Sequence, residues 1–369
     1  MKLVCNKDKL YEAVINTSKA ISERSSLPSL ESMKFKLEDS LLELTGYDLE
    51  IGIKTTIAVR SNDKGSLLIN AKLFSEMIKK MDSDDIVVDI DENLHITISG
   101  NSVVYDMMGK AADEYPELPD KNNCEKLTIP QTALKSMINQ TIFAVAVTDN
   151  NPVLKGELFE FERGKLTLAA IDGYRLAVRT ENIKNDEEKK FIVPSKTLAE
   201  VARLLSDNDE DSCEIFVAVK HIIFEINGYL VYSRLIEGEF HPYKSSIPKS
   251  SNIEVIVDRK ELMKSLDRAM LIISDRTPSP VRCYFENGII KIKCVCESTK
   301  IQDQISADIT GPVIEIGFKC KYLLDPLTKI DDEKVKLQMN GSLLPMKIVP
   351  LEGDGYTYLV LPVRLSKEV

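Results

Sequence analysis

Thiols are the side chains of this sequence best suited to bind a metal ion or to act as nucleophiles. Seven cysteines are spread over the 369 residues. Two of them, Cys294 and Cys296, form a C-x-C pair in a strand-like run, where alternation would place both sulfurs on one face. No second pair or nearby histidine completes a metal site. The odd count and scattered spacing favour the alternative, reduced structural thiols, so we predict no metal ion and no cofactor.

Carboxylates are the other candidates, and they gather in three acidic runs at 82–85, 207–211 and 331–333. Such runs can bind divalent metal ions. Each run, however, recurs at the same point of an internal repeat, where solvated loops are the simpler interpretation. The sequence contains no nucleotide-binding, hydrolase or zinc-protease motif, so we predict no catalytic residue. An enzyme, the first rival hypothesis, would need a clustered acid–base or metal site.

The composition is that of an ordinary globular protein, with 43% hydrophobic and 29% charged residues. No apolar run approaches the roughly 18 residues that a membrane span requires. The N-terminal segment becomes charged at once and has no apolar core of the kind found in signal peptides. We therefore predict a cytoplasmic protein with no membrane partner.

The elements that must position any site recur three times along the chain. Residues 6–21, 131–145 and 258–273 each place apolar side chains at i, i+3, i+4 and i+7, which predicts three long amphipathic helices. Equivalent leucines in these helices are 124 and 128 residues apart. The chain is therefore predicted to contain three copies of one structural unit.

Shorter helices and hairpins fill the rest of each repeat. The predicted short helices are 71–81, 195–205 and 319–330, the last with Pro326 inside it. Early hairpins are predicted to turn at 38–40, 163–164 and 286–288. In the third repeat a later hairpin is predicted to pair 335–339 with 343–349 across Asn340-Gly341, a strong turn signal.

The predicted fold class is α+β, with three tandem repeats of a domain in which two helices pack on antiparallel sheets. Each repeat would hold two helices and about eight strands in about a third of the 369 residues. The predicted domains are 1–120, 121–248 and 249–369, because the junctions near 120 and 250 are polar and rich in turn-forming residues.

Charge is distributed unevenly between these elements. The net charge of −10 argues by itself against nucleic-acid binding. The helical segments nevertheless hold 18 Lys and Arg against 10 Asp and Glu, whereas the remainder holds 30 against 48. These segments are 6–24, 72–80, 131–143, 195–205, 258–276 and 319–329. If the helices lie on one side of the protein, that side would offer a positive surface to phosphates. The alternative is that the helix charges face only water, which would give the same numbers of basic and acidic residues.

Short motifs then connect the repeats to a known family. Residues 170–177 read AIDGYRLA, and residues 358–365 read YLVLPVRL. They resemble the D-G-H-R-L-A and L-P-V-R segments of the bacterial DNA polymerase III beta subunits, the replicative sliding clamps. Shorter matches lie at 27–30, 113–116 and 315–318. The likeness follows one order along the whole chain and agrees with three repeats.

The resemblance implies a function without covalent chemistry. Clamps of this family are head-to-tail homodimers whose six domains form a ring, with helices lining the hole and sheets outside. Double-stranded DNA passes through the hole and is held without sequence specificity. The implied role is to confer processivity on the replicative polymerase. The implied partners are the DNA polymerase III alpha subunit, the clamp loader delta subunit, and other polymerases and repair proteins that carry clamp-binding peptides of the Q-L-x-L-F type.

The resemblance also implies a hydrophobic cleft for these peptides between the second and third domains. The implied cleft residues are Leu154, Ile171, Gly173, Tyr174, Arg175, Leu176, Pro242, Ser246, Tyr322, Leu343, Pro345, Val360, Leu361, Pro362, Val363 and Arg364. Arg175 and Arg364 are expected at the rim, where they would orient the peptide. Core packing is the alternative role for Leu176, Val360 and Leu361. The tail 366–369 is expected beside this cleft.

Two further sets of residues follow from the same resemblance. The implied DNA-facing residues are Arg24, Lys9, Lys19, Lys72, Lys79, Lys80, Lys196, Arg203, Lys260, Lys264 and Arg268. The implied dimer interface pairs Leu271, Ile272 and Ile273 of the third domain with Val104 and Met107 of the first. Departures from the family pattern occur at Tyr174, where a His is usual, around Pro242, and at Ser245 or Ser246, where an Arg is usual. The second rival hypothesis is a monomeric scaffold with the same domains.

Overall fold

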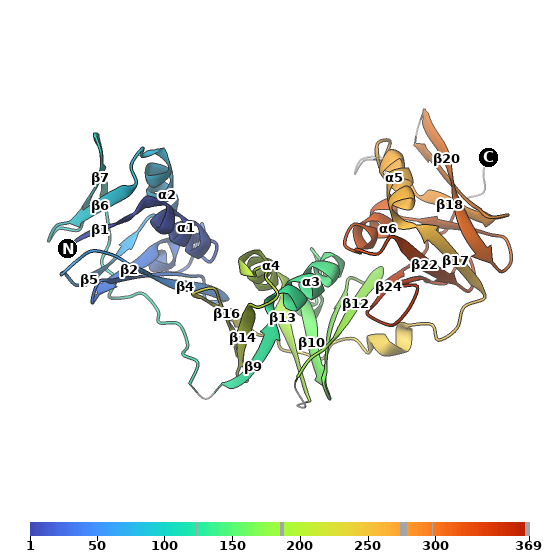
Figure 1. Ribbon diagram of the computed structural model, residues 1–369, viewed down its shortest axis with the longest axis horizontal. Helices are drawn as coiled ribbons and strands as arrows, with labels where there is room; N and C mark the ends of the chain where they lie inside the picture. Colours follow the sequence, from blue (N-terminus) through green and yellow to red (C-terminus); the bar gives the residue numbers. More distant parts are fainter. Residues whose placement is uncertain (123, 185–187, 274–278, 297, 366–369) are drawn as a thin grey trace. The chain divides into compact units, whose positions relative to one another are not determined.

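The structure, a computed structural model, describes residues 1–122, 124–184, 188–273, 279–296 and 298–365 (Figure 1). Each repeat holds one longer and one shorter α-helix. The helices are α1 (Lys7–Ser18), α2 (Ala71–Lys80), α3 (Gln131–Thr141), α4 (Ser195–Leu204), α5 (Arg259–Met270) and α6 (Cys320–Leu327). All six predicted helices are confirmed, with ends that differ by a few residues; α3 ends early because its last turn tightens into the 3₁₀ segment η2 (Ile142–Ala144).

Eight strands accompany the two helices of each repeat. The first repeat contains β1 (Lys2–Asn6), β2 (Met33–Glu38), β3 (Leu41–Tyr47), β4 (Ile51–Ala58), β5 (Gly65–Ile69), β6 (Asp85–Ile90), β7 (His95–Gly100) and β8 (Val103–Met108). The second contains β9 (Glu125–Pro130), β10 (Gly156–Glu162), β11 (Lys165–Ile171), β12 (Arg175–Asn182), β13 (Lys189–Pro194), β14 (Ser212–Val217), β15 (His221–Ile226) and β16 (Tyr229–Arg234). The third contains β17 (Ile253–Asp258), β18 (Val281–Glu286), β19 (Ile289–Cys296), β20 (Thr299–Thr310), β21 (Ile314–Phe318), β22 (Lys334–Met339), β23 (Met346–Val349) and β24 (Tyr356–Val360). The predicted α+β class with three repeats is confirmed.

Local sequence explains most element boundaries. Asn6 and Asp258 cap α1 and α5, because their side chains accept hydrogen bonds from Lys9 N at 3.1 Å and Glu261 N at 2.9 Å. The early hairpins turn where predicted, and each turn places two residues at positive φ, as in Asn287 (49°) and Gly288 (78°). Such turns match the twist of the strands that they join.

One predicted hairpin is wrong in detail. Strand β22 ends at Met339 and β23 begins only at Met346, so Asn340-Gly341 does not form a two-residue turn. The Asn340 side chain is committed elsewhere, since its Oδ1 accepts from Asn252 N at 2.9 Å and its Nδ2 donates to Ser250 O at 2.7 Å. The segment from Asn340 to Pro345 is therefore a loop rather than part of β23.

The same strand pairings recur in every repeat. Within a repeat, the fifth, second, third and fourth strands form one antiparallel sheet, and the first, sixth, seventh and eighth form another. Between repeats, the fourth strand pairs with the eighth strand of the next repeat: β4 with β16, and β12 with β24. In the third repeat β17 also pairs with the end of β20, so the sheets merge into one of eight strands, one of twelve, and one of four.

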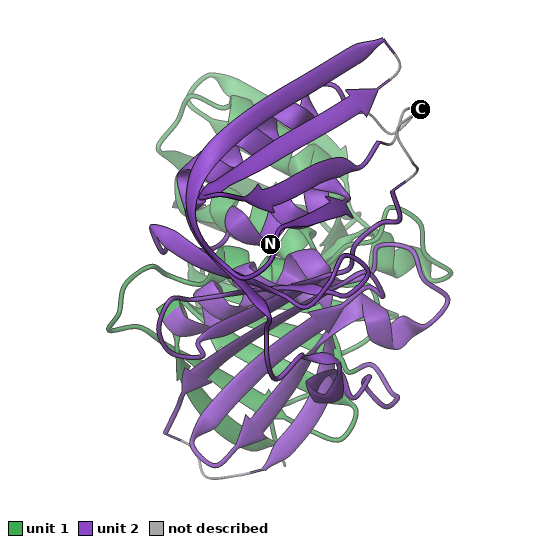
Figure 2. Ribbon diagram, turned by 90° about the vertical axis from the view of Figure 1, so that its right-hand side faces the viewer, with its two compact units in different colours: residues 1–132, 199–235 green, residues 133–198, 236–369 purple. Residues whose placement is uncertain are grey.

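The chain divides into two compact units that share the middle repeat (Figure 2). The first unit, residues 1–132 and 199–235, contains the eight- and four-stranded sheets, with α1 packed on α2. The second unit, residues 133–198 and 236–369, contains the twelve-stranded sheet, with α5 packed on α6. Each unit buries its own apolar core.

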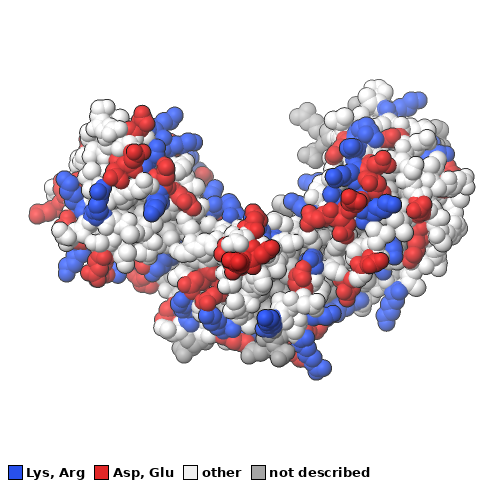
Figure 3. Space-filling model, in the orientation of Figure 1, with Lys and Arg blue, Asp and Glu red and all other residues white. Residues whose placement is uncertain are grey.

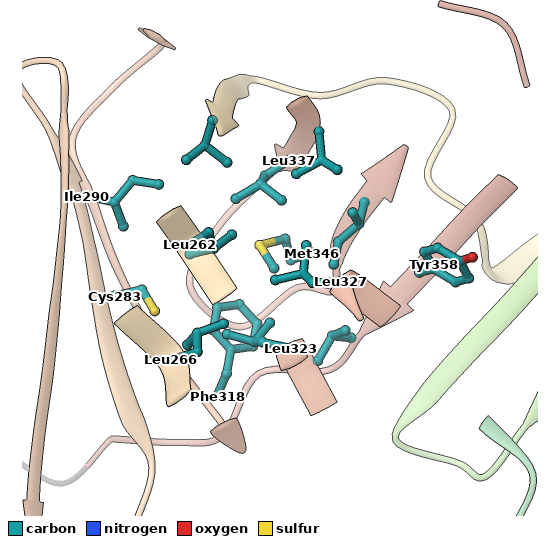
Figure 4. Close-up of a cluster of buried hydrophobic side chains, with 14 of the residues drawn as sticks. Leu262, Leu266, Cys283, Ile290, Phe318, Leu323, Leu327, Leu337, Met346 and Tyr358 are labelled. Atoms are coloured by element: carbon teal, nitrogen blue, oxygen red, sulfur yellow. The ribbon is translucent and has the colours of Figure 1, made fainter. Parts of the chain in front are cut away.

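The core of the third repeat shows how the helices meet the sheets (Figure 4). Leu262 and Leu266 from α5 and Leu323 from α6 gather on Phe318 at the end of β21, all of them buried. Leu262 and Leu266 follow the i, i+4 spacing that predicted a buried stripe on this helix. Cys283 lies in the same cluster, and burial raises the pKa of its thiol, as expected for a structural cysteine.

The acidic runs have a structural use in each repeat. The first backbone N–H of each long helix donates to a carbonyl of the run: Lys7 to Asp84 at 2.8 Å, Gln131 to Asp211 at 2.9 Å, and Arg259 to Glu333 at 2.8 Å. Among the described residues, no group of three His, Cys, Asp or Glu side chains is arranged to hold a metal ion. Within the same residues, no helix is long and apolar enough to cross a bilayer.

Candidate functional site

A pocket of about 690 Å³ opens in the second unit, where the middle and third repeats join. Its lining comes from segments far apart in the chain: the 3₁₀ segment η3 (Pro152–Lys155), the turn between β11 and β12, the linker after β16, and the ends of β23 and β24. The lining residues are Asn151, Val153, Leu154, Ile171, Gly173, Tyr174, Arg175, Leu176, Glu239, Phe240, His241, Pro242, Ser246, Pro345, Leu359 and Leu361.

The floor of the pocket is apolar and firmly packed. Val153, Leu176 and Leu359 are buried in one cluster beneath it, together with Tyr243 of the linker. Leu176 and Leu359 are paired neighbours on β12 and β24, so the junction between repeats itself forms the floor. A concave apolar surface of this size accommodates short apolar side chains of a ligand.

The turn between β11 and β12 forms one wall. Asp172 Oδ1 accepts hydrogen bonds from Tyr174 N and Arg175 N, both at 3.0 Å, and Gly173 takes a φ of 84° that favours glycine. Leu361 N donates to Tyr174 O at 2.9 Å, which ties the end of β24 to this turn. The turn is therefore fixed before any ligand arrives, and it leaves the Tyr174 ring exposed.

The prediction that Arg175 lies at the rim of the cleft is wrong. Its side chain is only 9% exposed, and its guanidinium donates to Asp172 Oδ2 at 2.9 Å and to Asp325 Oδ2 at 2.5 Å. It also stacks over the ring of Tyr322, with 4.6 Å from Cζ to the ring centroid. Because Asp325 and Tyr322 belong to α6, Arg175 joins the β11–β12 turn to the third repeat.

The linker that follows β16 forms the opposite wall and is anchored at both ends. Ile236 N donates to Ile192 O at 2.9 Å, and Tyr243 donates its hydroxyl to Glu160 Oε2 at 2.8 Å. Glu160 is buried and also pairs with Lys190 at 2.5 Å and Lys244 at 2.8 Å. Burial raises the pKa of this carboxyl, but hydrogen bonds from its three partners outweigh burial and hold the pKa below its usual range.

Ten of the sixteen predicted cleft residues line this pocket. They are Leu154, Ile171, Gly173, Tyr174, Arg175, Leu176, Pro242, Ser246, Pro345 and Leu361. Tyr322 lies beside it, with its ring centroid 6.1 Å from that of Tyr174. Leu343 is 69% exposed in the loop before Pro345, so it flanks the lining without belonging to it.

The remaining four predicted cleft residues lie outside the lining. Val360 is buried in the core of β24, so the core-packing alternative holds for it. Val363 forms a bridge with Gly317 on β21, and Pro362 and Arg364 flank it, because the chain leaves the pocket after Leu361 and continues beside β21. The tail 366–369, expected beside the cleft, lies outside the described residues.

Six lining residues were not predicted: Asn151, Val153, Glu239, Phe240, His241 and Leu359. Two signals in the sequence point to them. Glu239, Phe240 and His241 directly precede the predicted Pro242 in a linker, where a non-repeating segment is free to shape a site. Val153 and Leu359 are sequence neighbours of the predicted Leu154 and Val360, and the fold brings both into one buried cluster with Leu176.

Comparison with known proteins decides the family. Models of the N-terminal, central and C-terminal domains of the DNA polymerase III beta subunit match residues 1–119, 128–242 and 244–364. The beta sliding clamp of Halalkalibacterium halodurans is 31% identical, covering 99% of this chain and all of the relative. The chain belongs to the beta sliding clamp family of DNA polymerase III.

Solved sliding clamps share the fold over nearly the whole chain. The crystal structure of the Bacillus subtilis DNA polymerase sliding clamp matches with a TM-score of 0.94 and 29% identity, covering 99% of this chain and 100% of that one. A Pseudomonas aeruginosa sliding clamp, determined bound to griselimycin, matches with a TM-score of 0.92 and 25% identity over 99% and 100% of the two chains.

The eleven basic side chains expected to face DNA are all exposed. Lys260, Lys264 and Arg268 follow an i, i+4, i+8 spacing on one face of α5. Some of these side chains already have polar partners: Arg203 binds Glu200 and Asn16, and Arg268 binds Asp303. On the visible face, blue and red side chains are interspersed over both units of this sliding clamp (Figure 3).

The interface residues expected for a clamp dimer are placed less uniformly. Val104 is exposed on β8, but Met107 is only 8% exposed because it points into the core of the first unit. Alternation along the strand puts Met108, 61% exposed, on the outer face instead, so assigning Met107 to the interface is wrong by one residue. Leu271 is exposed, whereas Ile272 and Ile273 pack partly against the core of the third repeat.

Proposed function

We propose that this chain is a non-catalytic clamp that encircles double-stranded DNA and tethers the replicative polymerase, the clamp loader and repair proteins through the pocket of the second unit. The observation that carries the proposal is the pocket itself, with an apolar floor formed by Leu176 and Leu359 and walls held in place by the β11–β12 turn and the linker. A ligand with two or three apolar anchors is what such a surface binds. The proposed domains are 1–120, 121–248 and 249–369, and the proposed compartment is the cytoplasm.

The strand-pairing rule supports a head-to-tail homodimer. Because the fourth strand of each repeat pairs with the eighth strand of the next, two partners remain unused: β20, the fourth strand of the third repeat, and β8, the eighth strand of the first. Within the described part of the chain, residues Thr299–Ser306 of β20 pair on one side only, with β19, and β8 pairs only with β7. The same rule, applied between two copies, joins β20 of one to β8 of the other.

Exposed lysines on the helices support contact with DNA. Lys72, Lys79 and Lys80 on α2 and Lys9 on α1 have exposed side chains, as do Lys260 and Lys264 on α5. Contacts of this kind neutralise phosphates without reading bases, which permits sliding. We expect retention on DNA to depend on ring closure, so a covalently closed circular duplex should retain the clamp whereas a linear duplex with free ends should lose it.

A difference between the two junctions supports placing the cleft at the second. Tyr115 and Tyr243 are equivalent linker tyrosines, since each is buried and donates its hydroxyl to its own repeat, Tyr115 to Thr45 O at 3.1 Å. Three residues later the linkers differ, with Leu118 in the first and Ser246 in the second. Leu118 packs so closely on β4 that a Cβ on Gly52 would overlap it. Ser246 instead lines the pocket.

Filling the pocket therefore tests the proposed tether. We expect Ser246→Leu to weaken binding of a fluorescent Q-L-x-L-F peptide by about tenfold or more, because the added side chain occupies space that the peptide anchors need. The matched control is Ser245→Leu, which adds the same atoms one residue away, outside the lining. Equal affinity in wild type and S246L would refute the cleft assignment.

Mass in solution tests the proposed assembly separately. A head-to-tail pair has twice the chain mass of 41.5 kDa, and negative-stain images of the same sample should show rings. A particle of 41.5 kDa at micromolar concentration would contradict the dimer and favour a monomeric scaffold.

A further inference from the structure

We propose that the pocket selects peptides that carry a basic side chain beside their apolar anchors, and that Glu239 is the residue that determines this preference. The inference rests on the proposed peptide-binding function and adds the charge of the partner. It comes from the ionisable side chains that line the pocket: Arg175, Glu239 and His241, apart from the Tyr174 phenol.

The positive charge of Arg175 is not available to a ligand. Its guanidinium already donates to Asp172 at 2.9 Å and to Asp325 at 2.5 Å, so two carboxylates offset one cation. The group is also buried under the ring of Tyr322, at 4.6 Å. An acidic residue of a peptide would therefore meet a wall whose net charge is already negative.

Two other cations close to the pocket, Lys244 and Lys319, are committed as well. Lys244, in the linker, pairs with Glu160 at 2.8 Å and with Glu162 at 3.1 Å. Lys319 lies over the Tyr322 ring, 4.6 Å from its centroid. Neither lysine lines the pocket. The remaining basic group of the lining, the His241 imidazole, lies 3.4 Å from Ser246 Oγ.

Glu239, by contrast, is exposed at the pocket and has no ion-pair partner among the described residues. Its position is fixed, because the linker is held by Ile236 on one side and Tyr243 on the other. The preceding Gly238 lies so close to η3 that a Cβ there would be 2.7 Å from Val153 Cγ2. The carboxylate is therefore held at the pocket ready to accept a Lys or Arg side chain.

The expected preference is moderate because Glu239 is exposed to solvent. An exposed ion pair changes affinity by about 1.4- to 5-fold. Exchanging a basic for an acidic residue removes the attraction and adds a repulsion, so we expect a Lys peptide to bind about 2- to 25-fold more tightly than its Glu counterpart. Salt should reduce the difference, because exposed charges are screened.

The test uses fluorescent peptides of the Q-L-x-L-F type in which Lys, Ser or Glu occupies the middle position or either flank. Dissociation constants are measured on the full-length chain at pH 7.5, in low and high salt. The variants are Glu239→Gln and the matched control Glu237→Gln. Glu237 is an exposed carboxylate two residues earlier that does not line the pocket, so both variants change the net charge equally.

The expected result is a Lys-over-Glu preference, at one position or more, that Glu239→Gln abolishes and Glu237→Gln retains. Three results would overturn the inference and leave the proposed function standing. The peptides could bind without a charge preference, E239Q could leave the preference unchanged, or E237Q could reduce it as much as E239Q does. Failure of every peptide to bind wild type would overturn both.

Discussion

Replacing Glu157 by Gln should stabilise the second unit near neutral pH, because this carboxyl is fully buried without an ion-pair partner among the described residues. It lies at the start of β10, and Thr141 Oγ1 at the end of α3 is 2.5 Å from its Oε2. Its Oε1 has no hydrogen-bond partner in the described part of the chain. Burial raises the pKa of Glu157 from 4.5 to about 8, and the bond with Thr141 only partly offsets that shift.

The hydrogen bonds around Thr141 favour a protonated Glu157. The Thr141 hydroxyl has one proton but three acceptors in reach: Met137 O at 2.8 Å, Ile138 O at 3.4 Å and Glu157 Oε2 at 2.5 Å. If the hydroxyl donates to Met137, the short contact with Glu157 is satisfied only when the carboxyl supplies the second proton. Geometry and burial therefore agree that the neutral acid is the form that folds best.

The size and sign of the effect follow from proton linkage. With a folded pKa of about 8 against 4.5 unfolded, the folded state retains a proton that the unfolded state has lost. Stability is therefore complete below pH 4.5 and falls as pH rises from 4.5 to 8. The accumulated cost is about 1.4 kcal/mol at pH 5.5 and on the order of 4 kcal/mol at pH 7.5. Glu157→Gln, which cannot ionise, removes this cost.

Hydrogen exchange of amides in α3 and β10 measures the effect locally, since a chain of several repeats need not unfold in two states. We expect the gain of Glu157→Gln over wild type to grow by about 2–3 kcal/mol between pH 5.5 and 7.5. The matched control is Glu160→Gln on the same strand, where the depressed pKa means that ionisation stabilises the fold. That variant should lose stability at pH 7.5 and lose less as pH falls.

The decisive quantity is how much the stability difference between variant and wild type grows with pH. A poor fit of the Gln side chain would change that difference by the same amount at both pH values. If the difference between Glu157→Gln and wild type is the same at pH 5.5 and 7.5, Glu157 does not titrate in this range and the reasoning fails. A difference that shrinks with rising pH would show that the carboxylate, not the acid, is the stabilised form.

Two other predictions concern the pocket wall and the proposed seam. Arg175→Gln should raise hydrogen exchange in α6 and destabilise that region by about 3 kcal/mol, since it leaves two carboxylates without their cation. The control is Arg163→Gln at an exposed arginine, which should change neither the exchange in α6 nor the stability of that region. Met108→Glu should give folded monomers, measured by mass in solution, because it adds a charge to the outer face of β8. Met107→Glu should instead unfold the first repeat; a dimer that survives M108E would exclude this edge as the seam.

The elements were predictable because their signals are local. Amphipathic spacing predicted the three long helices, recurrence in each repeat predicted the three short ones, and residues able to adopt positive φ, such as Asn287 and Gly288, predicted the early turns. The turn at Asn340 failed for a non-local reason, since its side chain bonds Asn252 and Ser250 from the linker. Nothing within a few residues of Asn340 reveals those partners.

The site was predictable only in part, because its residues are brought together by strand pairing between repeats. Resemblance predicted Leu176 and Leu361, which line the pocket, but it could not reveal that Val360 on β24 belongs to the core. The error at Arg175 has a similar origin. An arginine next to a turn is usually exposed, and only the docking of α6, which brings Asp325 to its guanidinium, buries it.

The two junctions between repeats share their strand pairing but differ in the linker side chains that pack beside it. At each junction a fourth strand pairs with the eighth strand of the next repeat, β4 with β16 and β12 with β24. In the first, Leu118 packs so closely on β4 that a Cβ on Gly52 would overlap it, whereas in the second Ser246 and Leu176 both line the pocket. The repeat pattern therefore predicts the two junctions, while side-chain volume in the linkers, which no repeat pattern predicts, shapes the space beside them.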